Sequence, residues 1–258
     1  MTIILRKLAA SIIVLLCVGI VPTRADEIRV AVAANFSATL AKIAEAFEDA
    51  TGHRVILASG STGKHYAQII NGAPFDAFFA ADAARPRLLD EAGVGVPNSR
   101  YSYALGRLVL WSPQPGLVDD TGAILFSDDF HYLAIANPQL APYGAAAQDV
   151  LEELLLWEKL QGKLVRGENI NQTMQFVHSG NAQLGFVAAS QLIDGDDAVS
   201  GSGWHVPTDL HTPIRQQAIL LSDSAIARQF MQFAVRPEAK QIIKKNGYDL
   251  PQREIGQN

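Results

Sequence analysis

Short apolar runs and amphipathic stretches alternate along most of the chain. Residues 28–34 and 54–59 are apolar runs of strand length, and they predict buried strands. Between them, residues 38–50 carry apolar side chains at helical spacing with acidic residues opposite, which predicts an amphipathic helix. A further strand and helix follow within residues 75–92. This order predicts an α/β protein with a parallel sheet and helices on both of its faces.

The alternation is interrupted in the middle of the chain. Pro113 and Pro115 follow a short strand at residues 107–111, so we expect a boundary between two lobes near Gly106. A second series of elements begins with a strand at residues 132–136. The later elements expected are a helix from Pro142 to about Trp157 with Leu155 facing inward, a strand at 164–165, a helix at 172–178, a strand at 184–188, a surface loop at 194–203, a strand at 217–221, a helix capped by Ser222 and Asp223, and a final helix at 237–246.

Three loops share one design. Residues 33–37, 58–65 and 137–144 each follow a predicted strand and open a predicted helix. In a parallel sheet such loops lie at the carboxyl ends of the strands, where ligands bind. A helix N-terminus presents unpaired N–H groups and partial positive charge. The three loops therefore predict a site for an anion.

The run Ser-Thr-Gly-Lys at residues 61–64 needs comparison with the nucleotide-binding P-loop. That motif requires glycine where Ala58 stands and serine or threonine where His65 stands. Both positions fail, which argues against nucleotide binding. Taken alone, this loop favours the simpler interpretation as a glycine-rich turn with a hydroxyl cap, and it is the presence of three similar loops that favours an anion site.

The first 25 residues have the pattern of a cleavable signal peptide. Arg6 and Lys7 precede an apolar run, and Thr23 to Ala25 offers small residues at the −3 and −1 positions of a cleavage site. Cys17 lies inside the apolar run, but Leu16 before it is too large for a lipoprotein signal. We therefore expect a protein exported to the periplasm, with no cysteine left in the mature chain.

Composition and charge narrow the function classes. The chain is 48% hydrophobic and 18% charged, as in soluble globular proteins. Its formal net charge of −5 becomes −8 without the three basic residues of the first 25 positions. An acidic chain argues against nucleic acid and against anionic membranes as partners. An anion would have to be held by local dipoles rather than by the overall field.

Several stretches, taken in order, resemble the molybdate-binding proteins of bacterial ABC importers. These stretches are residues 32–36, 59–63, 71–82, 137–138, 141–144, 184–187 and 247–251. The resemblance implies a two-lobed periplasmic binding protein of type II topology, each lobe a mainly parallel sheet flanked by helices. It implies a signal peptide at 1–25, a first lobe at 26–106 closed by 207–258, and a second lobe at 107–206.

The resemblance also implies a ligand site between the lobes. It implies molybdate or tungstate as ligand, no cofactor, no metal bound directly by side chains, a monomer, and the membrane permease of an importer as partner. Ala34, Tyr143 and Ile170 would donate backbone N–H groups, whereas Asn35 and Thr62 could add side-chain donors. The residues assigned to the oxyanion are Ala34, Asn35, Ser61, Thr62, Tyr143 and Ile170.

The chemistry of the loops agrees with an oxyanion, and other function classes stay open. Molybdate only accepts hydrogen bonds, and the candidate loops hold Asn, Ser, Thr and backbone but no carboxylate. Sulfate, ferric iron or a small organic anion remain alternative ligands; Tyr101 and Tyr103 could reach iron, although packing is the simpler role for them. The six histidines show no metal-ligand spacing. A hydrolase on a similar scaffold would need a Gly-x-Ser-x-Gly elbow, which the chain lacks around Ser61.

We predict that the mature chain begins at Asp26, because the cleavage site ends at Ala25. N-terminal sequencing of the protein exported from its host measures this directly. Recovery of a chain carrying lipid on Cys17 would contradict the prediction.

Overall fold

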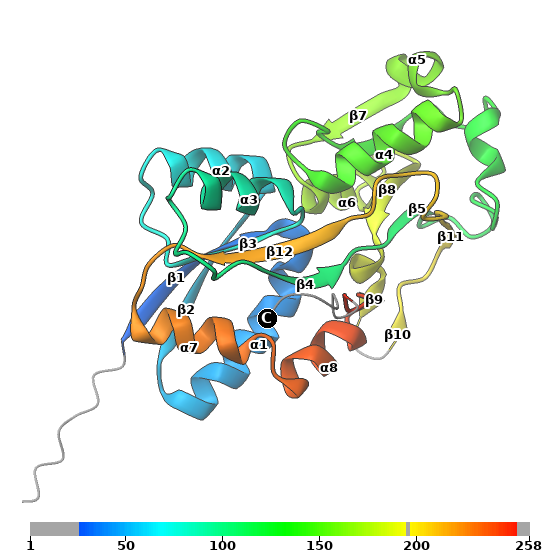
Figure 1. Ribbon diagram of the computed structural model, residues 1–258. Helices are drawn as coiled ribbons and strands as arrows, with labels where there is room; N and C mark the ends of the chain where they lie inside the picture. Colours follow the sequence, from blue (N-terminus) through cyan, green and yellow to red (C-terminus); the bar gives the residue numbers. More distant parts are fainter. Residues whose placement is uncertain (1–25, 195–196, 252–258) are drawn as a thin grey trace, which may run out of the picture.

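The computed structural model describes residues 26–194 and 197–251; the predicted signal peptide lies outside the described residues. Its framework is two five-stranded sheets flanked by helices (Figure 1). The first sheet has the order β2-β1-β3-β12-β4, with β1 Glu27–Ala33, β2 Arg54–Gly60, β3 Ala77–Ala80, β4 Tyr101–Leu105 and β12 Arg215–Leu220. The second has the order β11-β5-β8-β6-β7, with β5 Leu108–Ser112, β6 Leu133–Ala136, β7 Leu164–Gly167, β8 Leu184–Ala188 and β11 Ser202–His205.

Helices cover both faces of each sheet, as the alternating pattern predicts (Figure 1). The described residues include no helix that is both long enough and apolar enough to cross a membrane. The helices are α1 Ser37–Thr51, α2 Thr62–Ile70, α3 Ala84–Glu91, α4 Pro142–Glu153, α5 Trp157–Leu160, α6 Ile170–His178, α7 Ala225–Phe233 and α8 Pro237–Lys245. Short 3-10 helices lie at η1 Ala34–Phe36, η2 Ala123–Phe126, η3 Gln161–Lys163 and η4 Ala189–Leu192, and a small hairpin is formed by β9 Ile193–Asp194 and β10 Asp197–Ala198.

The two sheets are mainly parallel, with one strand in each running against its neighbours. Strands β1, β2 and β3 are parallel, and β12 is antiparallel to β3 and β4. In the second sheet β6 is parallel to β7 and β8, and β5 is antiparallel to β8 and β11. The reversals arise because the chain passes from β4 directly into the second sheet and later returns to the first through β12.

Strand register places the loops that carry the candidate site side by side. Ala33 at the end of β1 pairs with Gly60 at the end of β2. Ala136 at the end of β6 pairs with Gly167 at the end of β7. Each pair of parallel strands therefore ends level, and the turns that follow them start at neighbouring points.

Each sheet is packed between two apolar cores. In the first sheet, Val30 and Val32 point toward α1, α7 and α8, whereas Ala31 between them points toward α2 and α3. In the second sheet, Leu133 and Ile135 pack on the α4 side and Ala134 packs on the α6 side. This two-sided burial explains why the strands read as continuous apolar runs rather than alternating ones.

The helix expected to reach Trp157 ends earlier. Helix α4 stops at Glu153, and Leu155 adopts a left-handed conformation with φ 58° and is 89% exposed. The N–H of Leu156 donates to the carbonyl of Leu151, which closes the helix end in a Schellman motif. The prediction that Leu155 faces inward is therefore wrong, and α5 starts separately at Trp157.

Two other local expectations are corrected. The segment 194–203, expected as a surface loop, contains β10 and the start of β11, which pairs with the edge strand β5. Helix α7 is capped by Ser224, whose hydroxyl accepts from the N–H of Ala227 at 3.1 Å. Asp223, the expected cap, instead pairs with Arg228.

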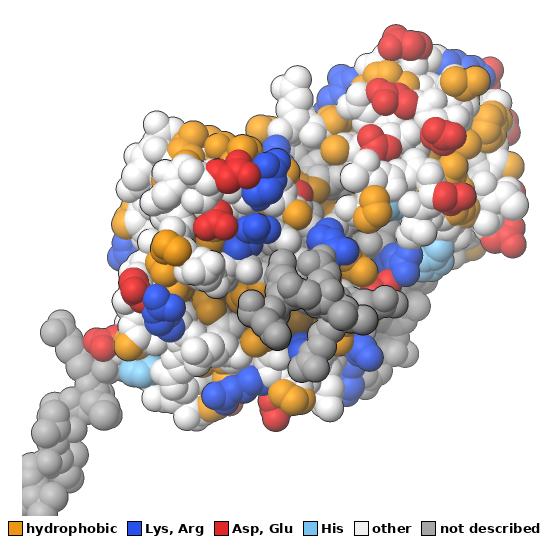
Figure 2. All heavy atoms as spheres, viewed as in Figure 1, with side chains coloured by type: hydrophobic (Ala, Val, Ile, Leu, Met, Phe, Trp, Pro, Cys, Tyr) orange, Lys and Arg blue, Asp and Glu red, His pale blue; other side chains and the backbone are white. Residues whose placement is uncertain are grey.

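Basic and acidic side chains are interspersed over the visible face of both halves (Figure 2). They are not gathered on that face into one extended basic patch. This agrees with the acidic net charge and with the expectation that local dipoles, not a surface field, would hold an anion.

Gly144 in the first turn of α4 should not tolerate a side chain. A Cβ there would lie 2.2 Å from the carbonyl oxygen of Ala136, which is backbone and cannot turn aside. We predict that Gly144→Ala costs about 1–3 kcal/mol, which lowers the melting temperature by roughly 2–12 °C. The matched control is Gly162→Ala, whose Cβ would meet nothing within 4 Å; equal melting temperatures for the two variants would contradict the prediction.

Candidate functional site

Four turns meet between the two sheets and enclose a small cavity. Two of them follow β1 and β2, and the other two lead into α4 and α6. The cavity volume is about 10 Å³, against roughly 300–1,000 Å³ for sites that hold organic ligands. It is therefore too small for an organic ligand of that size. The lining residues are Ala33, Ala34, Asn35, Gly60, Ser61, Thr62, Ala81, Ala141, Pro142, Tyr143, Asn169 and Ile170.

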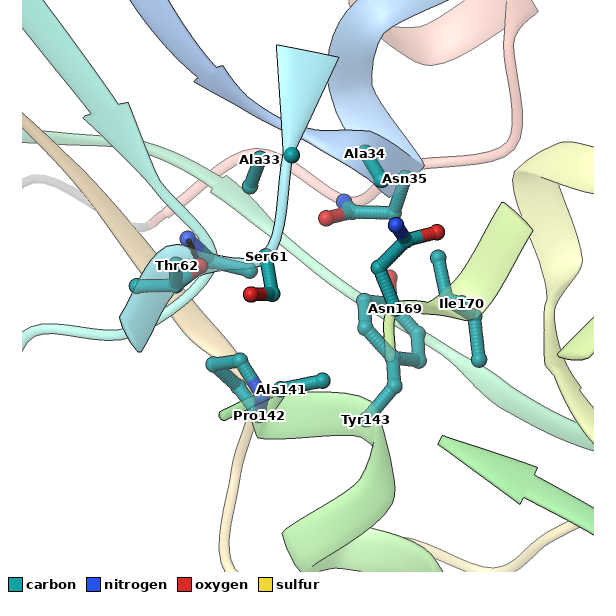
Figure 3. Close-up of a pocket in the computed structure, with 12 residues that line it drawn as sticks. Ala33, Ala34, Asn35, Ser61, Thr62, Ala141, Pro142, Tyr143, Asn169 and Ile170 are labelled. Carbon is teal, nitrogen blue, oxygen red and sulfur yellow. Dashed lines mark hydrogen bonds between the residues drawn. The ribbon is translucent and has the colours of Figure 1, made fainter. Parts of the chain in front are cut away.

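All six residues assigned to the oxyanion by resemblance line this cavity. Figure 3 shows the turns of the first half facing those that carry Tyr143 and Ile170. Sequence reasoning did not assign Asn169, which also lines the cavity. The sequence did contain a signal for Asn169, because asparagine directly before a helix is a favoured N-cap residue.

Two hydroxyl groups at the start of α2 can donate into the cavity. Ser61 is the N-cap residue of α2, but its hydroxyl makes no capping hydrogen bond. The Ser61 oxygen is buried and has no partner among the described residues. The Thr62 oxygen accepts from the N–H of Ala81 at 3.1 Å, which leaves the hydroxyl proton of Thr62 free to donate.

Two helix N-termini of the second half add backbone donors. Tyr143 is the second residue of α4, after Pro142, and Ile170 is the first residue of α6. N–H groups at these positions have no partner within the helix. The Asn169 side chain accepts from two later N–H groups, of residues 171 and 172, and so leaves that of Ile170 unclaimed by the cap.

The side-chain amide of Asn35, implied by the resemblance as a donor to the oxyanion, has its nitrogen engaged within the protein. Its amide nitrogen donates to Gln216 Oε1 at 2.9 Å and to the Tyr248 hydroxyl at 3.1 Å. An amide has two hydrogens, and both are therefore taken. Asn35 itself remains part of the cavity wall.

The lining carries no charge, and the charged groups lie at the mouth. None of the described residues that line the cavity is Asp, Glu, Lys or Arg. Lys64 is exposed and pairs with Glu168 across the mouth at 2.9 Å. An exposed pair of this kind contributes about 0–1 kcal/mol, so Lys64 is a rim residue rather than a ligand contact.

The two halves touch around the mouth of the cavity. The N–H of Gly63 donates to the Leu140 carbonyl at 2.8 Å. The Arg85 guanidinium donates to the Gln139 carbonyl at 2.9 Å. The described structure is therefore one in which the cavity is closed by direct contact between the halves.

His65 is a buried structural residue below the α2 turn. Its Nδ1 lies 3.1 Å from Gln68 Oε1, and its ring meets Phe75 and Phe78 edge-on. Burial lowers the pKa of His65 below its usual value, opposed by the hydrogen bond to Gln68. The imidazole is therefore neutral near pH 7 and adds no charge to the site.

The tyrosines near the cavity are also neutral. Burial raises the pKa of Tyr248 to about 12, and it raises the pKa of Tyr103 and of Tyr143 well above their ordinary values. These hydroxyls keep their protons at any physiological pH, so no phenolate repels an anion.

The geometry gives no support to the iron alternative. The described part of the chain contains no group of three or more His, Cys, Asp or Glu residues that could hold a metal ion. The Tyr101 hydroxyl donates to the Met231 carbonyl at 2.9 Å, and the Tyr103 hydroxyl lies 3.0 Å from the Ala80 carbonyl. Both tyrosines therefore serve the packing of the first half, as their spacing also suggested.

Two sheets that enclose a donor-lined cavity between them define a class of protein, the two-lobed solute-binding proteins. The family model described as bacterial extracellular solute-binding protein matches residues 28–249, and the chain belongs to this family.

The relatives of the chain carry a common description. The molybdate-binding protein ModA of Azotobacter vinelandii is 50% identical over 230 residues, 88% of this chain and 91% of that protein. The ModA of Rhodobacter capsulatus is 47% identical over 230 residues, 88% of this chain and 90% of that protein. A solved structure of the A. vinelandii periplasmic molybdate-binding protein has a TM-score of 0.85 at 45% identity, covering 87% of this chain and all of that one. The resemblance read from the sequence is thus confirmed.

The pKa of His65 predicts a pH dependence of stability. Because the folded pKa is lowered, the unfolded chain takes up the proton first as pH falls below about 6.5. The contribution of neutral His65 to the free energy of unfolding is therefore present above that pH and is lost on acidification. We expect the melting temperature to fall further between pH 7.5 and pH 5 in the wild type than in His65→Gln.

The matched control is His131→Gln at an exposed position, which should follow wild type across the same range. Melting temperatures of wild type and His65→Gln that fall in parallel would contradict this account of His65.

Proposed function

We propose that this chain captures molybdate or tungstate in the periplasm and delivers it to the membrane permease of an ABC importer. The observation that carries the proposal is the cavity, whose described lining offers hydrogen-bond donors from four turns and no charged side chain. The names of relatives that share about half the sequence support the same ligand.

The donor set suits a fully deprotonated tetrahedral oxyanion. Molybdate carries four acceptor oxygens and no proton, so a wall made only of donors matches every side of it. A protonated phosphate would need an acceptor for its remaining hydrogen, and a carboxylate in the wall would repel any dianion. Sulfate shares the chemistry of molybdate but is smaller, which makes it the competitor to test.

The lobes proposed for this function are residues 26–106 with 207–258 and residues 107–206. The membership of the two sheets supports this division, since β5 to β8 and β11 form one sheet and β1 to β4 with β12 form the other. Ser61 and Thr62 belong to the first lobe, whereas Tyr143 and Ile170 belong to the second. A ligand that uses donors from both lobes favours the closed arrangement, because only that arrangement offers all of them.

The remaining features of the proposal follow from binding without chemistry. The protein acts without turnover and without a cofactor, as a monomer exported by a signal peptide removed after Ala25. Molybdenum is held only through its oxygens. The acidic net charge agrees with a partner that is a protein in the membrane rather than nucleic acid.

Ser61→Ala and Thr62→Val should each weaken molybdate binding. Each removes one hydroxyl donor at nearly constant volume, and a hydrogen bond to a charged acceptor is worth about 1.5–3 kcal/mol. The dissociation constant should therefore rise roughly ten- to a hundredfold. Titration calorimetry with molybdate, tungstate and sulfate on wild type and on both variants measures this.

Thr208→Val, at an exposed position between β11 and β12, is the matched control and should bind as wild type does. If wild type gave binding heat with sulfate but none with molybdate, sulfate rather than molybdate would be the ligand. Unchanged molybdate affinity in both Ser61→Ala and Thr62→Val would overturn the proposed donor set.

A further inference from the structure

Gln216 belongs to a buried hydrogen-bond network of the first half, at the point where the second half meets it. It stands on β12, is fully buried, and adjoins a register shift between Gln216 and Gln217 in the pairing with β4. Its Oε1 accepts from Asn35 Nδ2 at 2.9 Å and lies 3.0 Å from the Tyr103 hydroxyl. Such irregularities redirect side chains and are common beside functional sites.

The other end of the Gln216 amide faces the second half. Gln216 Nε2 and the Tyr143 hydroxyl are both buried without a hydrogen-bond partner of good geometry among the described residues. Both approach the same point above Gly106, where a Cβ would lie 2.3 Å from the Tyr143 hydroxyl and 3.0 Å from Gln216 Nε2. A donor and an acceptor thus face each other where the chain crosses between the sheets, and a glycine leaves room for them.

Through Tyr248, Asn35 also links the hydrogen-bond network to Ser190 in the second half. The Tyr248 hydroxyl accepts from Asn35 Nδ2 and donates to the Asn35 carbonyl at 2.7 Å. Ser190 Oγ, in η4 after β8, lies 2.9 Å from the same hydroxyl. Gln216 therefore bonds Asn35 through Oε1 and approaches the Tyr143 hydroxyl with Nε2, and Tyr248 links the Asn35 turn to Ser190.

We propose that Gln216 is a positioning residue for the anion site, holding the Asn35 turn of the first half against the start of α4 in the second. This proposal rests on the proposed function. Gln216 does not line the cavity, so it acts through the placement of two donors, the backbone N–H groups of Asn35 and Tyr143. Loss of its amide removes the group common to both walls and makes the closed arrangement less favourable.

The adjacent glutamine supplies a matched control. Gln217 is 9% exposed, and its amide accepts from Arg100 at 2.9 Å and donates to Ser102 at 3.1 Å, within the first half alone. Gln216→Met and Gln217→Met thus each remove a buried, hydrogen-bonded amide of equal size from the same strand. A purely structural role predicts similar losses of melting temperature and no difference in binding.

The experiment measures molybdate affinity by calorimetry and, separately, the radius of gyration of the ligand-free proteins by X-ray scattering. We expect Gln216→Met to weaken binding roughly tenfold and to increase the ligand-free radius, because the hydrogen bond to Asn35 and the approach of Nε2 to the Tyr143 hydroxyl are both lost. Gln217→Met should match wild type in both. Tyr143→Phe, which keeps the ring and the backbone N–H, should also weaken binding and add little in the Gln216→Met background.

Equal affinity and equal radius for Gln216→Met and Gln217→Met would overturn the inference. Full additivity of Gln216→Met and Tyr143→Phe would also overturn it, because residues that act as a unit are non-additive. A wild type that binds no molybdate would overturn the proposed ligand, while the ligand-free radius would still decide the role of Gln216.

Discussion

The proposed ligand, an oxyanion enclosed away from water, accounts for the arrangement of the donor turns in this structure. An ion loses its hydration on burial, so its oxygens must meet donors on every side. No single turn supplies enough of them. The paired ends of β1 and β2 bring two turns together, and the paired ends of β6 and β7 bring two more. Because the two sheets face each other, these four turns together line one small cavity.

The cavity wall carries no formally charged side chain among the described residues. In an acidic protein, an anion bound there would have to be held by short-range donors. Helix N-termini and hydroxyl groups provide partial positive charge that acts over a few ångströms. Lys64, the cation nearest in sequence to the donor turn, is instead paired with Glu168 at the mouth. The buried imidazole of His65 is neutral as well. The donors of the cavity wall therefore do not depend on positive charge at the protein surface.

Polar groups behind the wall are as constrained as those that form it. The amide nitrogen of Asn35, a residue of the cavity wall, donates to Gln216 and Tyr248 behind it. The buried tyrosine hydroxyls stay protonated and act only as hydrogen-bond partners. A buried network of this kind specifies one arrangement of the two halves, since every group left unpaired carries a desolvation cost.

The sequence by itself determined the alternation of strands and helices and the class of fold, and its resemblance to a known family supplied six residues that share one cavity. It could do so because periodicity and strand-to-helix turns are local properties, and because parallel strands end at one edge. It did not determine that Leu155 turns outward, that β11 completes the second sheet, or that the Asn35 amide is bonded to Gln216 and Tyr248. Those outcomes depend on partners such as Leu151, β5 and Gln216, some of them far away in sequence, and only tertiary packing selects them.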